Sequence, residues 1–508
     1  MPTPRQANVM NKFIDVSQII KRKLAGLTSF AALSLSVSLS AHALPLQTTG
    51  AGFTPVSETQ CFLAGSTERL DCKTYHLPLD YSDPNGDTVE VFAAVMPSRG
   101  GKAAGDPLVL LAGGPGQAAS EVIQLVDVAF GDLRNGRDVL IVDQRGTGRS
   151  HPISCKNVDS EIVTLEDYSE GVKACREAEP LPVRHFNFDN IIRDLEEIRA
   201  SLGYEKLNLW GISWGTRSAA HYLRRYPDRV RSIVVDGVLP PQVPLVATVA
   251  DSVERAKRLL VEDCEKSLAC IARYPDIDGM INRLLDKAKS GDLVFDGINP
   301  LTNERETTEI NFIGAVNGLH ALFYNADATT SIPYMLDEAL KGNLNPWLVF
   351  SFNASTDEPP IYPGSFLSIF CGEEMSKVTA ASAKAAGSDS FAEDAHYQLW
   401  NAGCEAWDYV PAAEDSHEIL ESDVPTLVLS GNLDPITPPM MGDEWVKSFS
   451  NSRHIVVNGT GHNTSFTACM PGLITSFIKN LDVDALDTGC MDHLKRLPII
   501  TGPNATVQ

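Results

Sequence analysis

Short apolar runs alternate with segments of helical period along the first half of the chain. The runs lie in VEVFAAVMPS, DPLVLLAGGPG, DVLIVDQRGTGRS, KLNLWGISWG and RVRSIVVDGVLPP, and Gly, Asp or Pro follows most of them, as at the ends of buried strands. Between them lie two segments with the period of amphipathic helices, FDNIIRDLEEIRASLG and TRSAAHYLRRYP. Strands that alternate with helices predict a mostly parallel sheet covered by helices on both faces.

This alternation stops at about residue 240 and returns at about residue 420. The intervening segment consists of helical pieces such as SVERAKRLLVEDCEKSLAC, separated by polar loops. The pattern of strands followed by loops then returns in VPTLVLSGNLDPITPP and SRHIVVNGTGHNTSF. We therefore predict one α/β sheet in two parts, residues 44–239 and 421–508, with an inserted, mainly helical lid at residues 240–420. A separate second domain is the alternative, but the returning strands make it less economical.

The N-terminus has the pattern of an export signal. Lys21, Arg22 and Lys23 precede the run LAGLTSFAALSLSVSLS, and AHA at residues 41–43 offers small residues for cleavage. We predict a signal peptide over residues 1–43, cut after Ala43, and a periplasmic or secreted protein with no membrane attachment after cleavage. A retained anchor is the alternative, but serines dilute the run and it is short for a membrane span.

Composition and charge limit the class of protein and of partner. Hydrophobic residues make up 43% and charged residues 21% of the 508, which is typical of globular proteins and excludes fibrous and disordered classes. Loss of residues 1–43 removes five basic residues and one acidic residue, which changes the formal charge from −23 to −27. Such an acidic surface repels phosphate backbones, so we expect no nucleic-acid partner.

The ten cysteines indicate an oxidising compartment, in which disulfides persist. Spacing leaves many pairings open, but pairing of chain neighbours is favoured because each loop is then short. Zinc is the competing interpretation; since no CxxC occurs and the histidines are scattered, we predict no metal. The cysteines are Cys61, Cys72, Cys155, Cys175, Cys264, Cys270, Cys371, Cys404, Cys469 and Cys490.

The stretch GISWG contains the first candidate catalytic residue, Ser213. A GxSxG pattern between a strand and a helix is typical of a tight turn that exposes a nucleophilic serine, with Gly211 and Gly215 removing side chains that would collide. The backbone N–H of Trp214 would then lie at a helix N-terminus, where it stabilises a developing oxyanion. The alternative is a structural strand end flanked by glycines.

A serine nucleophile needs a base and a carboxylate that orients the base. In α/β folds with this serine turn, the carboxylate, Asp or Glu, follows the serine along the chain, and the histidine follows the carboxylate. Asp434 comes directly after the strand TLVLS, and His462 comes after HIVV, so both emerge at the same edge of the sheet as Ser213. Four rival residues fit less well. His454 lies inside a strand and His417 in a polar helical stretch, and neither Asp443 nor Asp423 follows a strand end.

The loop GGPG at residues 113–116 supplies the second candidate oxyanion donor, the N–H of Gly114. An ordinary turn and a phosphate-binding loop are the alternatives. The latter needs Lys and Ser or Thr where this chain has Gln117 and Ala118. In DQRGTGRS we expect Asp143 and Arg145 to brace the neighbouring loops.

Five motifs that follow one another along the chain, GGPG, VDQRGTGRS, GISWGTRSA, LSGNLDPITP and GTGHN, resemble the proline iminopeptidase and tripeptidyl aminopeptidase group of the α/β-hydrolases, and the resemblance runs from about residue 72 to 490. The resemblance implies an α/β-hydrolase fold and a serine exopeptidase that acts on peptides with a free N-terminus, without metal or organic cofactor. It also implies a triad of Ser213, Asp434 and His462, with Gly114 and Trp214 as oxyanion donors. One departure is Ala112, where the family often has histidine before GGPG.

The segment SIFCGEEM resembles the CxE segment of the family, which implies that Glu373, or else Glu374, receives the substrate amine through charge-assisted hydrogen bonds. A solvated pair at a helix start is the alternative. For Trp407 and Tyr362 we expect core packing rather than a role in the substrate pocket.

The expected function is therefore an exported serine aminopeptidase, of prolyl or tripeptidyl type, that works through an acyl-enzyme. An exported esterase or lipase on the same fold is the alternative, since it would share the triad and the oxyanion donors. A catalytically silent binding protein of this fold is a third hypothesis.

Overall fold

The computed structural model describes residues 53–101, 103–155, 158, 164–298, 303–349 and 360–503. The predicted signal peptide at residues 1–43 lies outside these ranges. Within them, no helix combines the length and the apolar character that crossing a bilayer requires.

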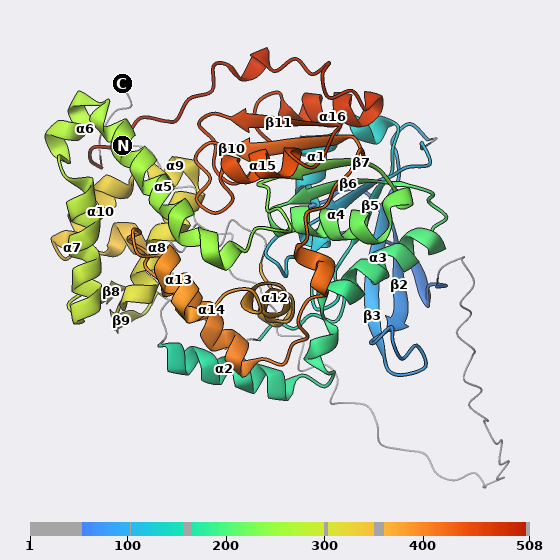
Figure 1. The fold of residues 1–508 in the computed structure, drawn as a ribbon, viewed down its shortest axis with the longest axis horizontal. Coiled ribbons are helices and arrows are strands. Elements are labelled where there is room, and N and C mark those ends of the chain that lie inside the picture. Colours follow the sequence, from blue (N-terminus) through green and yellow to red (C-terminus); the bar gives the residue numbers. More distant parts are fainter. Residues whose placement is uncertain are drawn as a thin grey trace, which may run out of the picture. The chain divides into compact units, whose positions relative to one another are not determined.

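A nine-stranded sheet runs through the described part of the chain (Figure 1), in the spatial order β1-β2-β3-β5-β4-β6-β7-β10-β11. The pairs from β5 to β11 are all parallel, and the pairs β1–β2, β2–β3 and β3–β5 are antiparallel. This confirms the predicted mostly parallel sheet. Its strands are β1 (Ser57–Cys61), β2 (Leu70–Pro78), β3 (Thr88–Met96), β4 (Leu108–Leu111), β5 (Val139–Val142), β6 (Leu207–Ile212), β7 (Val230–Asp236), β10 (Thr426–Gly431) and β11 (Ser452–Val457).

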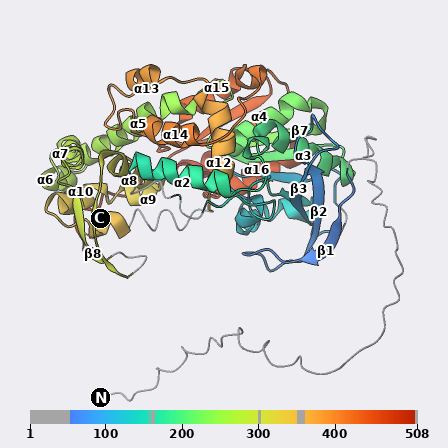
Figure 2. The same ribbon diagram turned by 90° about the horizontal axis from the view of Figure 1, so that it is seen from below.

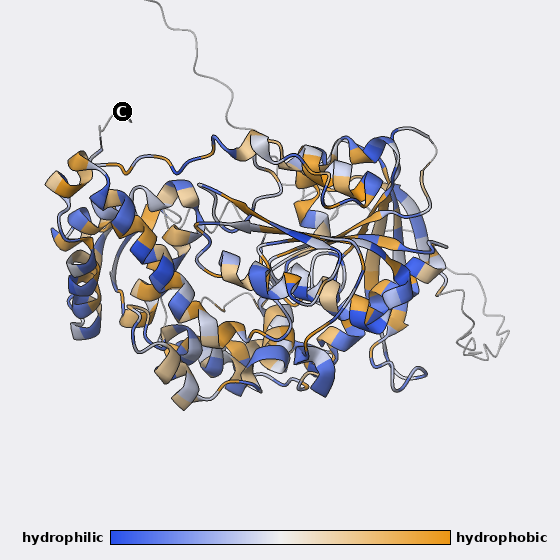
Figure 3. Cartoon of the chain, turned by 45° about the horizontal axis from the view of Figure 1, so that its top comes forward, coloured by the Kyte–Doolittle hydropathy of each residue, from blue (hydrophilic) through white to orange (hydrophobic). Residues whose placement is uncertain are grey.

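The sheet separates two hydrophobic cores because side chains alternate along each strand. In β4, Leu108 and Leu110 pack into the core under α1 (Gln124–Phe130) and α16 (Met470–Asn480). Val109 and Leu111 pack into the other core, under α3 (Phe188–Ser201) and α4 (Trp214–Arg225). The helices show both hydrophilic and hydrophobic residues (Figure 3), as amphipathic helices on a sheet do.

Between β7 and β10 the described residues are mainly helical and include a short hairpin. In Figures 1 and 2, α6, α7, α10 and the hairpin lie at the opposite end of the fold from β2 and β3. The elements are α5 (Leu245–Glu265), α6 (Leu268–Arg273), α7 (Ile277–Ser290), β8 (Val294–Ile298), β9 (Arg305–Glu309), α8 (Phe312–Tyr324), α9 (Ala326–Thr329), α10 (Ile332–Leu340), α12 (Pro363–Phe370), α13 (Ala380–Ala386) and α14 (Ala395–Ala406).

One helix outside the predicted lid packs against it. This helix, α2 (Leu165–Ala178), precedes β6 in the chain, yet it lies against α14 and α12. We therefore propose a lid that consists of residues 240–420 together with α2. The remaining helix, α15 (Pro439–Val446), packs against β10 and β11.

All ten cysteines form disulfides, and the pairs follow chain order. One of them, Cys371–Cys404, lies within the lid and joins α14 to the single π-helical turn Cys371–Met375 that follows α12. The others are Cys61–Cys72, Cys155–Cys175, Cys264–Cys270 and Cys469–Cys490.

Candidate active site

Ser213 occupies a strained turn between β6 and α4. Its backbone has φ +56° and ψ −124°, a region that non-glycine residues rarely adopt. A Cβ on Gly211 would lie 2.3 Å from the carbonyl oxygen of Gly215, and a Cβ on Gly215 would lie 1.9 Å from that of Leu111. Only glycine therefore fits two positions before and two positions after the serine, which is the steric reason for the GxSxG pattern.

Asp434 lies fully buried in the loop after β10, and both of its carboxylate oxygens accept hydrogen bonds. Its Oδ1 accepts from the backbone N–H groups of Ile436 and Thr437, each at 2.9 Å. Its Oδ2 lies 2.8 Å from the Thr437 hydroxyl and 2.8 Å from Nδ1 of His462.

Burial by itself would raise the pKa of Asp434. The charge of His462, its hydrogen bond and the two backbone N–H groups outweigh that effect, so the pKa lies below the usual value. Because an ionised carboxylate only accepts hydrogen bonds, Nδ1 of His462 carries the hydrogen, and Nε2 is the basic nitrogen of the neutral ring.

Ser213 and His462 each lie beside the end of β7. The Ser213 N–H donates to the carbonyl oxygen of Asp236 at 2.9 Å. At the next residue, Gly237, a Cβ would lie 3.1 Å from Cε1 and 3.2 Å from Nδ1 of His462, so the imidazole lies directly over this glycine. The strand ends of β6, β7, β10 and β11 thus bring the predicted nucleophile, base and carboxylate to one edge of the sheet.

The glycine loop after β4 lies against the nucleophile. A Cβ on Gly113 would be 3.0 Å from the Cβ of Ser213, so the loop backbone approaches the serine closely. Gly114 has φ +103°, which favours glycine. Gly116 accepts a hydrogen bond from the N–H of Tyr362 at 2.9 Å and thereby links this loop to the lid. The N–H groups of Gly114 and Trp214 remain our candidates for the oxyanion donors.

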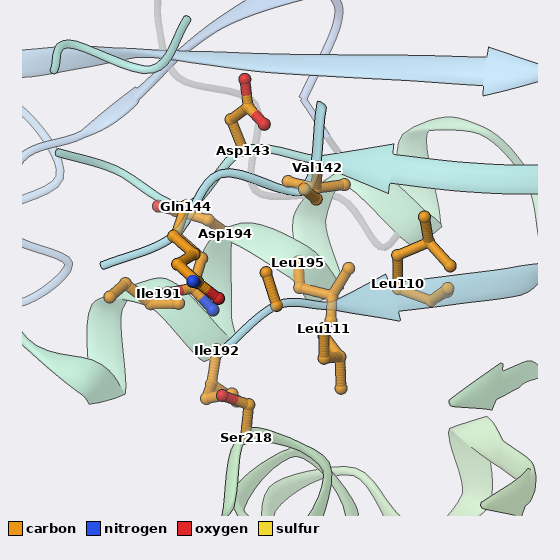
Figure 4. Close-up of a pocket in the computed structure, with 14 residues that line it drawn as sticks. Leu110, Leu111, Val142, Asp143, Gln144, Ile191, Ile192, Asp194, Leu195 and Ser218 are labelled. Atoms are coloured by element: carbon orange, nitrogen blue, oxygen red, sulfur yellow. The ribbon is translucent and has the colours of Figure 1, made fainter. Parts of the chain in front are cut away.

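A small cavity lies behind this loop (Figure 4). It is bordered mainly by apolar side chains of β4 and α3, with Ser218 of α4 on one side and Asp143 on another. Ala112, where the family often has histidine, is one of the lining residues. The small side chain therefore borders space that the neighbouring residues leave unfilled.

The two glutamates of the lid have different surroundings. Glu374 is fully buried and forms an ion pair with Arg217, so its charge is balanced. Oε2 of Glu373 lies 3.7 Å from Nε2 of His221 and 3.8 Å from Nε2 of His417. These three atoms are buried and have no hydrogen-bond partner among the described residues. Burial raises the pKa of Glu373 to about 8, against the opposing charge of Arg217.

Two family models cover the segments that carry this site. Residues 106–258, which contain the glycine loop and Ser213, match the alpha/beta hydrolase fold, and residues 390–490, which contain Asp434 and His462, match the TAP-like protein family. The chain has the α/β-hydrolase fold, and the relatives it matches include tripeptidyl aminopeptidases and proline iminopeptidases.

Several curated relatives of this α/β-hydrolase are peptidases by name. It is 29% identical to the serine protease Hip1 of Mycobacterium tuberculosis over 242 residues. This aligned segment covers 42% of this chain and 46% of the relative. It is 30% identical to the tripeptidyl aminopeptidase of Streptomyces lividans, over 34% of this chain and 36% of the relative. It is 28% identical to the proline iminopeptidase of Aeromonas sobria, over 55% of this chain and 60% of the relative. The chain thus spans about half the length of the curated relatives it matches.

The solved structures that this chain matches include the proline iminopeptidase of Mycobacterium smegmatis. That match has 16% sequence identity and a TM-score of 0.36, over 81% of this chain and 99% of that chain. At that score we base the fold assignment on the strand order and the family models.

The rival candidates of this hydrolase have structural partners. His454 lies in β11, with Nδ1 2.9 Å from Asp443 and Nε2 3.0 Å from the Ser430 hydroxyl. The two aromatic residues considered for the substrate pocket also have structural partners. Trp407 is buried and donates to the Ser368 hydroxyl at 2.9 Å, and the Tyr362 hydroxyl donates to Glu121 at 2.7 Å.

Asp143 and Arg145 lie buried behind the site and connect neighbouring segments. Asp143 accepts from the N–H of Ser120 at 2.8 Å and of Arg149 at 2.9 Å. Arg145 binds Asp194 of α3 at 2.6 Å.

Sequence reasoning missed several residues that support the triad. The Thr437 hydroxyl, besides its bond to Asp434, lies 3.1 Å from Nδ1 of His462. Asp236 accepts from the N–H groups of Thr464 at 2.9 Å and Ser465 at 2.7 Å, which anchors the loop after His462. The signal for Asp236 was present in SIVVDG, where an aspartate ends a strand much as Asp434 follows one.

Glu373 predicts an unusual dependence of stability on pH. Between about pH 4.5 and 8 its carboxyl stays protonated in the folded state but ionises in the unfolded state. Its contribution to stability is therefore complete below the unfolded pKa and is lost as the pH rises through the folded pKa, by up to about 1.4 kcal/mol per pH unit. Glu373→Gln cannot ionise, so we expect it to gain roughly 2–4 kcal/mol relative to the native protein between pH 5 and 8.

Urea unfolding at pH 5, 6.5 and 8 measures this difference. Glu393→Gln, which changes an exposed lid carboxylate paired with Lys289, is the matched control and should follow the native protein at every pH. Parallel stability curves for the native protein and Glu373→Gln would contradict the prediction.

Proposed function

We propose that this hydrolase is an exported serine aminopeptidase that removes a short peptide from substrates with a free N-terminus. The observation that carries the proposal is the buried Asp434–His462 pair, at 2.8 Å, whose imidazole lies over Gly237, the residue after the Asp236 that binds the Ser213 N–H. The five disulfides support an oxidising compartment. The peptidase names of the relatives support a peptide substrate.

The proposed chemistry is two-step acyl transfer. Nε2 of His462 takes the proton of the Ser213 hydroxyl, and Oγ attacks the carbonyl carbon of the scissile peptide bond. The N–H groups of Gly114 and Trp214 stabilise the oxyanion, because they are preorganised toward the point where charge develops. The proton then passes to the leaving amine, and water, activated by the same imidazole, hydrolyses the acyl-enzyme. None of these steps calls for a metal or an organic cofactor.

Glu373 is the proposed partner of the substrate amine. An ammonium nitrogen carries three hydrogens, and three buried polar atoms without partners converge here: Oε2 of Glu373 and Nε2 of His221 and of His417. Nδ1 of His417 lies 3.1 Å from the carbonyl oxygen of Pro241, so that nitrogen carries the hydrogen and Nε2 accepts. Ammonium binding would ionise Glu373 and replace its proton by a charge-assisted contact. Glu374, already neutralised by Arg217, is the weaker candidate.

The position of His221, the member of this cluster that lies on α4, supports the release of a peptide rather than a single residue. His221 stands eight residues after Ser213, which corresponds to about 12 Å along a helix axis. An extended peptide advances about 3.3–3.6 Å per residue, so three to four residues span that length. The tripeptidyl type therefore fits this spacing better than the prolyl type.

The test compares 4-nitroanilides of one, two and three residues, with free and with acetylated N-termini. We expect the free tripeptidyl substrate to be the best, and acetylation to lower kcat/KM by roughly 100-fold, because it removes the ammonium group that forms the charge-assisted contact with Glu373. Glu373→Gln should lower kcat/KM for the free tripeptide by a similar factor and leave p-nitrophenyl acetate hydrolysis unchanged.

Glu393→Gln is the control for the loss of a lid carboxylate. Equal rates on free and acetylated peptides would refute amine recognition. Rapid ester hydrolysis without peptide hydrolysis would favour the exported esterase.

A further inference from the structure

A continuous chain of ring contacts in the lid spans the candidate active site. It begins at His462, whose ring centroid lies 5.0 Å from that of Tyr324, and it ends at Trp214, the residue after Ser213. Successive centroids are 4.8–6.0 Å apart. The rings between the proposed base and the proposed oxyanion donor are Tyr324 and His320 of α8, His396 and Trp400 of α14, and Phe370 of α12.

The two histidines are neighbours in the middle of this series of rings. Nδ1 of His320 lies 3.0 Å from Nε2 of His396, so the two imidazoles share one hydrogen. His320 is 9% exposed and His396 is 3% exposed. Their outer nitrogens, Nε2 of His320 and Nδ1 of His396, have no hydrogen-bond partner among the described residues. A buried polar atom without a partner is costly, which makes this pair a candidate for contact with a ligand.

The shared hydrogen determines what the outer nitrogens offer. When Nδ1 of His320 donates to His396, Nε2 of His320 is an acceptor and Nδ1 of His396 is a donor. When the shared hydrogen belongs to His396, both outer roles are reversed. A pair of neutral imidazoles therefore always presents one donor and one acceptor.

Both histidines resist protonation. Burial lowers the pKa of His396 to about 4, and burial together with His396 lowers the pKa of His320 well below its usual value. The charges of Asp434 and His462 also act on His320, which is consistent with its position beside the triad. The site therefore suits a neutral ligand group that has both a donor and an acceptor.

We propose that the outer nitrogens of His320 and His396 form a subsite for backbone peptide groups of the substrate. A peptide group is neutral and offers one N–H and one C=O, which matches the donor and the acceptor of the pair. This inference rests on the proposed peptidase function, and it adds a specificity element that the lid supplies. The Cys371–Cys404 disulfide ties α14 to the turn after Phe370 and so fixes the helix that carries His396.

Two substitutions delete the outer nitrogens without removing the inner hydrogen bond. His320→Asn keeps a nitrogen near the position of Nδ1, and His396→Gln keeps one near the position of Nε2. Each should lower kcat/KM for a tripeptidyl nitroanilide by roughly 10-fold, the usual worth of one lost hydrogen bond. Hydrolysis of p-nitrophenyl acetate, which contains no peptide group, should stay within about twofold. His454→Gln, in β11, is the control for the loss of a buried imidazole.

Substrate variants test the same contact in the unmodified protein. Tripeptidyl nitroanilides in which each internal amide is N-methylated in turn lack one N–H. One of them should be cleaved roughly 10-fold more slowly by the native protein. The same methyl group should have a much smaller effect in His320→Asn or His396→Gln, because the partner is already missing.

Three outcomes would overturn the proposal. Equal losses on peptide and ester in the two variants would assign the pair to lid packing, and unchanged peptide kinetics would remove the subsite. Additive effects of N-methylation and substitution would show that the two groups do not meet. A native protein that hydrolyses the ester but no peptide would refute the proposed function, and the subsite with it.

Discussion

Ser213→Ala is expected to lower kcat for peptide hydrolysis by about 10⁵-fold or more and to abolish labelling by a fluorophosphonate probe. The serine Oγ is the only atom that the proposed mechanism joins covalently to the substrate, so no neighbouring group can replace it. Residual activity would reflect the oxyanion donors and substrate binding alone. Steady-state kinetics and probe labelling measure the two effects independently.

Ser218→Ala is the matched control for this prediction. Ser218 lies in the same helix, α4, and its buried hydroxyl has no hydrogen-bond partner among the described residues, so its loss should leave kinetics and labelling unchanged. Circular dichroism of both variants should match the native protein. Retained labelling in Ser213→Ala, or its loss in Ser218→Ala, would place the nucleophile elsewhere.

Asp434→Asn is expected to lower kcat by roughly 10⁴-fold. Asp434 is ionised near neutral pH because the charge and hydrogen bond of His462, with the backbone N–H groups of Ile436 and Thr437, lower its pKa despite burial. An amide lacks that charge and turns an N–H toward Nδ1 or the Thr437 hydroxyl, so the imidazole is no longer fixed with Nε2 as the base.

The control is Asp443→Asn, since this rival carboxylate faces His454 rather than His462. It should keep kcat within about twofold. A large loss in Asp443→Asn together with a small one in Asp434→Asn would contradict the assignment. Acid unfolding gives a second test: the stabilisation by ionised Asp434 is present above its unfolded pKa and is lost as the pH falls through its lower folded value, a contribution that Asp434→Asn should lack.

The candidate nucleophile, base and carboxylate could be predicted because each depends on local rules. Ser213 stands between glycines whose Cβ atoms would collide with backbone, and that constraint is visible in five consecutive letters. Asp434 and His462 each follow an apolar run, and the carboxyl ends of parallel strands meet at one edge of a sheet. Neighbouring cysteines pair for a similar reason, because short loops cost little to close.

The environment of the lid glutamates could not be predicted in this way. Glu373 and Glu374 are adjacent in the chain, yet Arg217 neutralises one, while the other faces His221 and His417. Their partners come from α4, far away in the chain, and the direction of each side chain depends on how the turn at Cys371–Met375 packs. Nothing in the letters CGEEM distinguishes the two carboxylates.

The apolar periods, the glycines of the turn and the order of the motifs along the chain were enough to predict an α/β sheet, an inserted lid and the three triad candidates, because sterics and side-chain periodicity act between near neighbours. The antiparallel β1–β3 edge, the packing of α2 on α14 and the His320–His396 contact were decided only when the chain folded. Each of these joins segments that have no local preference for one another, so only the closure of the whole core selects the partner.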